Sequence, residues 1–187
     1  MGDGFRELSR IVRTDAFGVR LGRVTVAAPD GSVRTRSFLH SPEVVAIVAV
    51  HEADLLLVNQ FRAAVGVHVL ALPMGKVAPG QQLEDAAAAE LAEETGFTPG
   101  RIERVSTLLA CPGWMDQLMH VFRADGLTEL AARPPSDDPD DIEEQEMAVV
   151  RLPLSRVREA VESGRLRDAR SIAAIHLALD FGRLGKG

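Results

Sequence analysis

The feature that most constrains this chain is a run of three glutamates inside a short alanine-rich segment. Residues 83–95 are rich in Ala, Glu and Leu, and Gly96 follows directly, a pattern typical of an α-helix that ends at a glycine. On such a helix Glu90 and Glu94 project from the same face, and Glu93 lies beside them. Like charges at these spacings repel by about 0.2 to 0.5 kcal/mol per pair, so stability alone does not explain the arrangement.

A divalent cation would make this charge cluster favourable. Carboxylates and water are hard oxygen ligands suited to Mg²⁺, with Mn²⁺ as a substitute, and Mg²⁺ commonly bridges to the phosphates of a substrate. Just upstream, a loop bounded by Gly75 and Gly80 allows the backbone to approach a ligand closely, and we expect the preceding carbonyl, of Met74, to supply another oxygen ligand. The alternative is a helix face that is simply solvated.

The composition narrows the class of protein. The 187 residues are 46% hydrophobic, enough for one core with a small appended subdomain. A net charge of -6 disfavours nucleic acid or an anionic membrane surface as the main partner. The single cysteine excludes an internal disulfide and fits a reducing cytoplasm. Residues 1–13 lack the apolar stretch of a signal peptide, and the most apolar window, 44–50, is too short to span a membrane.

The remaining sequence alternates between strand and helix patterns. Alternating apolar residues with turn signals predict strands at 18–38 (a hairpin), 44–50, 55–61, 104–109, 118–124 and 147–152. Helices are expected from 153 towards 163 and over 171–184, and the proline-rich acidic stretch 133–146 is expected to be a loop. We therefore expect an α/β (α+β) sandwich with a mixed sheet. An N-terminal β segment should cover 1–42 and the main domain 43–187.

Residues 75–97, GKVAPGQQLEDAAAAELAEETGF, match the Nudix box G-x5-E-x7-R-E-U-x-E-E-x-G-U in length without a gap. The flanking sequences resemble the ADP-ribose and nucleotide-sugar pyrophosphatase branch of the Nudix hydrolase superfamily. LVNQFR at 57–62 resembles that branch's strand ending in Q-Y-R, LPMG at 72–75 resembles L-P-A-G, and CPGW at 111–114 resembles S-P-G-F/Y.

This resemblance implies an α/β/α sandwich and a metal-dependent hydrolase. Its substrate would be ADP-ribose or a nucleotide sugar, split by water into a nucleoside monophosphate and a phosphorylated product. The resemblance assigns the metal, Mg²⁺, to Glu90, Glu94 and the Met74 carbonyl, and it makes Glu93 an additional ligand or a group that positions water. It also implies a homodimer in which the N-terminal β segment packs on its partner.

The resemblance further implies a catalytic glutamate in the late acidic segment, either Glu143 or Glu144, that orients or deprotonates the attacking water. For substrate binding, the resemblance points to the backbone at Gly75 and Gly113.

Two larger side chains have alternative roles. Arg62 either holds a phosphate or stacks on a base, or it forms an ordinary surface ion pair. Trp114 either stacks on a nucleobase or packs in the core or in a dimer.

Four positions depart from the family pattern. In the box, Ala89 replaces the usual arginine and Gln81 replaces a glutamate. Ala71 and Gln117 replace glutamates that are usual in the ADP-ribose branch. Loss of the arginine predicts a looser metal site or a substitute cation, for which Lys76 is one option. These departures keep two alternatives open. One is a degenerate Nudix domain that binds a nucleotide without efficient cleavage, and the other is a hydrolase of a specialised metabolite diphosphate.

Overall fold

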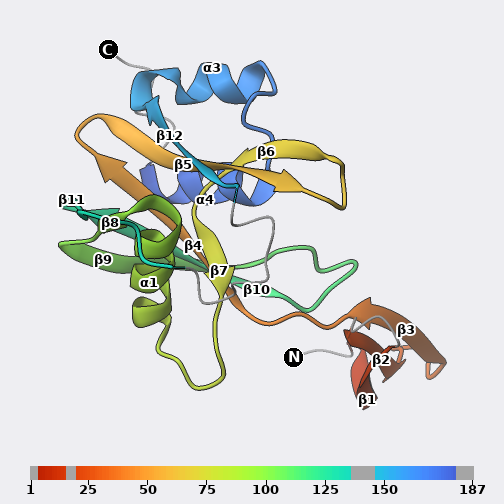
Figure 1. The fold of residues 1–187 in the computed structure, drawn as a ribbon. Coiled ribbons are helices and arrows are strands. Elements are labelled where there is room, and N and C mark those ends of the chain that lie inside the picture. Colours follow the sequence, from red (N-terminus) through yellow and green to blue (C-terminus); the bar gives the residue numbers. More distant parts are fainter. Residues whose placement is uncertain (1–3, 16–19, 136–145, 180–187) are drawn as a thin grey trace. The chain divides into compact units, whose positions relative to one another are not determined.

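The structure is a computed structural model, and it describes residues 4–15, 20–135 and 146–179 (Figure 1). Contacts within the chain define two compact units. The N-terminal unit comprises Met1–Glu43 and Leu109–Leu118, and the main unit comprises Val44–Leu108 and Met119–Gly187. The segment Leu109–Leu118 therefore groups with the N-terminal residues although it lies far along the sequence. The division into two domains after residue 42 stays a prediction.

The N-terminal unit is built on a three-stranded antiparallel sheet in the order β1-β2-β3. Its strands are β1 (Arg6–Thr14), β2 (Arg20–Ala27) and β3 (Val33–Leu39). The predicted turn between the last two is present, with Gly31 at φ 79 and the N–H of Ala28 donating to the Ser32 carbonyl at 2.8 Å. β1 falls within the predicted β segment 1–42, but no separate strand was predicted there, because its apolar residues Leu8, Ile11 and Val12 do not alternate with polar ones.

The main unit contains a seven-stranded mixed sheet in the order β12-β5-β4-β10-β9, with β6 paired to β5 and β7 paired to β4. Its strands are β4 (Val44–His51), β5 (Asp54–Arg62), β6 (Val67–Ala71), β7 (Met74–Lys76), β9 (Arg101–Leu109), β10 (Leu118–Asp125) and β12 (Ala148–Pro153). β4 runs parallel to β10 and antiparallel to β5 and β7. The two short strands β8 (Phe97–Thr98) and β11 (Thr128–Glu129) pair with each other.

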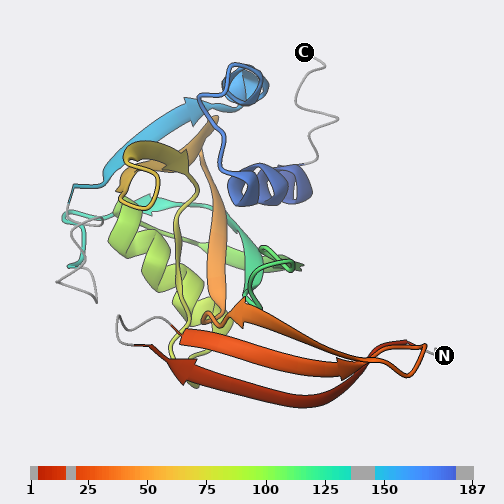
Figure 2. The same ribbon diagram turned by 90° about the vertical axis from the view of Figure 1, so that its right-hand side faces the viewer.

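Helices cover both faces of this sheet, which confirms the predicted α/β/α sandwich. Figure 2 shows α1 (Leu83–Thr95) on one side of β4 and α4 (Ala169–Leu179) on the other. The short 3-10 turn Leu154–Arg156 and α3 (Val157–Glu162) follow β12. Within the described ranges, no helix has the length and apolar character that crossing a membrane requires.

The continuous apolar run of β4 is explained by burial on both faces. Val44, Ala46 and Val48 belong to the core on the α4 side, together with Ala174 and Ile175. Their neighbours in sequence, Val45, Ile47 and Ala49, belong to the core on the α1 side. One strand therefore joins the two cores, and its first six residues, Val44–Ala49, are all buried and apolar.

The predicted helix packs as its sequence pattern indicates. Ala86, Ala87 and Leu91 are buried against the sheet. Gly96 ends the helix in the left-handed region at φ 78, and its N–H donates to the Ala92 carbonyl at 2.8 Å. The buried stripe fixes the rotation of α1, so its remaining faces have defined directions.

Replacing the central packing residue of α1 tests this arrangement. Leu91 is 0% exposed, so Leu91→Ala should lower the free energy of unfolding by about 2–5 kcal/mol through lost burial and the cavity left behind. The matched control is Leu177→Ala on α4, whose side chain is 44% exposed and whose effect should stay within about 0.5 kcal/mol. Urea denaturation measures both, and equal losses would contradict the packing of α1.

Candidate active site

Glu94 links α1 to the short strand β7. Its side chain is 5% exposed, and its Oε2 accepts the N–H of Met74 at 2.9 Å. A buried carboxylate needs hydrogen-bonding partners, and this backbone amide supplies one of them. The bond holds Glu94 beside the backbone of Met74, and the role of both residues as metal ligands stays a prediction.

Glu90 lies against the same strand, one helical turn before Glu94. A Cβ atom at position 75 would overlap the Glu90 carboxylate, so only glycine leaves the space that this carboxylate takes. Gly75 pairs with Val45 in β4, which holds its backbone in place. The structure therefore assigns Gly75 a contact with Glu90. Its predicted contact with substrate stays a prediction.

The donor set fits a divalent cation by its chemistry. Two carboxylates are hard oxygen ligands of the kind that Mg²⁺ and Mn²⁺ take, and the Met74 carbonyl stays a predicted third ligand. Among the described residues, no group of three His, Cys, Asp or Glu side chains is arranged to hold a metal ion. A cation here would therefore also need oxygen ligands other than side chains, which Mg²⁺ commonly obtains from water and substrate phosphates. Glu93 is half-buried on the same helix, and its role stays a prediction.

Arg133 also lies near this site, although no sequence pattern predicted it there. Its guanidinium donates to the backbone carbonyl of Glu94 at 3.4 Å, at the C-terminal end of α1. The last turn of α1 contains no basic residue of its own, and the helix dipole makes that end negative. Arg133 therefore brings a positive charge to the end of the helix that carries the glutamates. The sequence held one indication of this role, since Arg133 is the only basic residue between Arg123 and Arg151.

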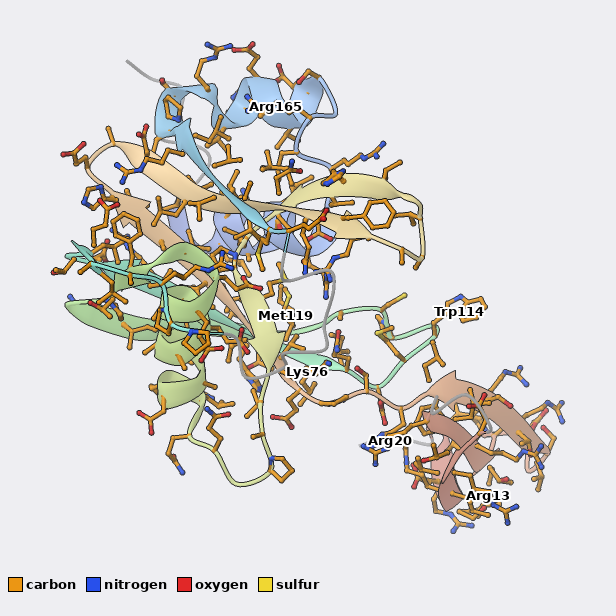
Figure 3. The ribbon with its side chains drawn as sticks, in the orientation of Figure 1. Arg13, Arg20, Lys76, Trp114, Met119 and Arg165 are labelled. Carbon is orange, nitrogen blue, oxygen red and sulfur yellow. The ribbon has the colours of Figure 1, made fainter. Side chains whose placement is uncertain are left out.

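Two further predicted residues of the main unit lie at the ends of strands. Arg62 ends β5, is half-buried, and its carbonyl accepts the N–H groups of Val65 and Gly66 in the turn to β6. Lys76 ends β7 and is exposed (Figure 3). Glu143 and Glu144 lie outside the described residues.

Comparison with known proteins decides the family. The model of the NUDIX domain matches residues 40–173, which include β4 to β12 and the glutamate helix. The chain belongs to the NUDIX family. This confirms the resemblance of residues 75–97 to the Nudix box.

Individual proteins agree with this assignment. The chain is 31% identical over 151 residues to an "ADP-ribose pyrophosphatase" of Bacillus subtilis strain 168, covering 80% of this chain and 79% of that protein. It is 28% identical over 127 residues to a "GDP-mannose pyrophosphatase" of Salmonella paratyphi B, covering 65% and 64%. These relatives and the NUDIX match confirm the predicted class of enzyme, a Nudix pyrophosphohydrolase.

A solved structure supports the fold. The crystal structure of an ADP compounds hydrolase superposes with a TM-score of 0.76 at 21% identity, covering 93% of this chain and 91% of that one. At this identity the likeness concerns the fold alone.

Two departures from the Nudix pattern have local structural roles. Gln81 replaces a box glutamate, and its Oε1 accepts the N–H of Ala78 at 3.0 Å in the turn before α1. Gln117 is 9% exposed, and its Nε2 donates to Ser41 Oγ at 2.7 Å and to the Pro42 carbonyl at 3.2 Å. An ionised glutamate cannot donate to a carbonyl, so this pair of bonds requires the amide.

Trp114 and Gly113 belong to the N-terminal unit, in the turn before β10. The Trp114 carbonyl accepts the N–H of Leu39 at 2.8 Å, while its indole is 71% exposed and projects from the turn (Figure 3). Core packing within the described chain is therefore excluded for Trp114. Stacking on a base and contact with a second copy stay as its two predicted roles.

Next to this turn, Asp116 is held by ring and backbone donors. His40 Nδ1 lies 2.7 Å from one of its carboxylate oxygens, and the N–H of Ser41 donates to the other at 3.1 Å. Partial burial opposes ionisation, but these hydrogen bonds outweigh it and hold the pKa of Asp116 below its ordinary value.

A methyl group at position 75 should disturb the proposed metal site. Gly75→Ala must displace the Glu90 carboxylate, so we expect pyrophosphohydrolase kcat/KM to fall by about a hundredfold, as for a misplacement of about 1 Å. Steady-state kinetics would measure this, with the melting temperature of each protein as the control for folding. Full activity in a folded variant would contradict the contact.

The Asp116 interactions predict a pH-dependent stability. Because its folded pKa is lowered, the carboxylate stabilises the fold above the unfolded pKa of about 3.9, and this stabilisation is lost as pH falls through the folded value. Asp116→Asn should therefore lower the free energy of unfolding at pH 7 by up to about 1 kcal/mol, with the difference from wild type shrinking towards pH 4 and below. Urea titrations across this range test it, and a constant difference would contradict the assignment.

Proposed function

We propose that this protein hydrolyses the diphosphate of ADP-ribose, or of a closely related nucleotide sugar, with Mg²⁺ as its metal. Water would attack the diphosphate to give a nucleoside monophosphate and a second phosphorylated product. The observation that carries the proposal is the contact of Glu90 and Glu94 with Met74 and Gly75, which puts the box carboxylates beside a backbone strand. The names of the two relatives given above support this class of substrate.

In this proposal, Glu90, Glu94 and the Met74 carbonyl hold the cation. The bound cation would polarise the bridging phosphates and lower the pKa of a water ligand. The Met74 N–H keeps the Glu94 carboxylate oriented, and the buried side of α1 keeps both glutamates from turning away. Glu93 would add a ligand or position water.

Other residues would bind the substrate and complete the chemistry. Arg62 offers a planar donor group suited to a phosphate, and Trp114 offers an exposed ring for stacking on a base. We propose Glu143 or Glu144 as the carboxylate that orients or deprotonates the water. Those two residues lie outside the described part of the chain.

We further propose a homodimer that acts in the cytoplasm. The described part of the N-terminal unit exposes several large apolar side chains: Phe5, Leu8, Ile11, Leu21 and Val33. Exposed apolar area of this kind favours burial against a second copy. The single cysteine is consistent with a reducing compartment, and the net charge of -6 disfavours nucleic acid as a partner.

The degenerate binding domain is less favoured than the enzyme. Its motivation was the set of departures at Ala89, Gln81, Ala71 and Gln117, and two of these positions have structural roles of their own. Glu90 and Glu94 are retained beside β7. A specialised metabolite diphosphate remains a choice of substrate on the same site.

Removing one carboxylate charge tests the proposed function. Wild type with Mg²⁺ should convert ADP-ribose to AMP and ribose 5-phosphate, and Glu94→Gln should lower kcat by roughly a hundredfold to a thousandfold. The matched control is Glu84→Gln, which makes the same change at an exposed position in the first turn of α1 and should leave kcat unchanged. Product analysis by mass spectrometry gives the readout. Undiminished hydrolysis in Glu94→Gln would reject this site.

A further inference from the structure

A buried hydrogen-bond network joins α4 to the segment that leads into β7. Ser171, in the first turn of α4, is 0% exposed, and its hydroxyl accepts the N–H of Leu72 at 2.9 Å. The same hydroxyl donates to the Asp168 carboxylate at 2.7 Å, and that carboxylate also accepts the Ser171 N–H at 2.9 Å. Asp168 therefore orients the serine hydroxyl so that its lone pair faces Leu72.

Leu72 lies at a break in the strand pairing. β6 ends at Ala71, β7 begins at Met74, and Pro73 between them has no N–H. The Pro73 carbonyl accepts the N–H of Ile47 at 3.0 Å, so β4 holds one side of this link. Ser171 holds the other side, because a buried N–H at Leu72 would be costly without an acceptor.

The two residues between the strands, Leu72 and Pro73, set the position of β7. Directly after this link, Met74 donates to Glu94, and Gly75 leaves the space for the Glu90 carboxylate. A movement of the link would shift these backbone groups relative to α1. The network acts from the opposite face of the sheet, since α4 and α1 cover different sides of β4 (Figure 2).

We propose that Ser171 and Asp168 are positioning residues for the metal site. They fix the Leu72–Met74 backbone, and through it the spacing of the oxygen ligands on β7 and α1. The inference rests on the proposed metal-dependent function. A role limited to capping α4 would affect stability alone and would leave the affinity for metal unchanged.

Binding of Mn²⁺ alone to the full chain tests this inference without a substrate. Electron paramagnetic resonance measures free Mn²⁺, and Glu94→Gln identifies the binding that belongs to the site. We expect Ser171→Ala to bind Mn²⁺ about tenfold more weakly than wild type, the lower end of the effect of removing a group that orients a metal ligand. Hydrogen exchange should also show faster exchange of the Leu72 amide.

Three further variants separate positioning from general destabilisation. Ser171→Thr keeps the hydroxyl and should bind Mn²⁺ more tightly than Ser171→Ala does. Ile175→Val removes a buried methyl from the same helix without touching the network, and should bind like wild type. Asp168→Asn weakens the orientation of the hydroxyl, should also bind Mn²⁺ more weakly, and replaces Ser171→Ala as the test if that variant does not fold.

The outcomes are distinct. Wild-type affinity for Mn²⁺ in Ser171→Ala, or an equal loss of affinity in Ile175→Val, would overturn the positioning role. If wild type binds Mn²⁺ at Glu94 but does not cleave ADP-ribose, the proposed substrate fails while the comparison of Mn²⁺ affinities still decides the role of Ser171. If wild type does not bind Mn²⁺ at all, both proposals fail.

Discussion

The contact between the second half of α1 and β7 is the constraint on which the rest of the site depends. Glu94 takes a hydrogen bond from the Met74 backbone, and Glu90 takes the space that a side chain at position 75 would occupy. Both contacts fail if the helix slides or rotates. Ala87 and Leu91 prevent this, because they lie beside the glutamates on the sheet-facing side of the helix and pack against β4 and its neighbours.

This arrangement places negative charge where a helix least favours it. Glu93 and Glu94 lie in the last turn of α1, at the negative end of the helix dipole, and no basic residue lies in that turn. Arg133 offsets part of the cost at the Glu94 carbonyl. A divalent cation held by the carboxylates would offset more, which makes metal binding the physical reason for tolerating the cluster. The absence of the box arginine at Ala89 is consistent with positive charge reaching this helix end from elsewhere in the chain.

The departures from the Nudix pattern have a simple physical explanation in two cases. Gln81 and Gln117 replace carboxylates with amides, and each side chain is used in hydrogen bonds within its own unit. Gln117 donates to a carbonyl, which an ionised carboxylate cannot do. These substitutions therefore adjust loops near the sequence motifs, while the carboxylates beside β7 are kept.

The sequence by itself determined the elements whose signal is local. The buried strand β4, the helix α1 with its glycine end, and the family membership through the box all follow from periodicity and spacing over about two dozen residues or fewer. The short strands β6 and β7 did not follow, because three to five residues are too few to show a period. The bond from Leu72 to Ser171 joins residues that are 99 positions apart in the chain, and the bond from Arg133 to Glu94 joins residues that are 39 positions apart. Only the tertiary structure decided these contacts, because a hydrogen bond between distant residues leaves no pattern in either local sequence.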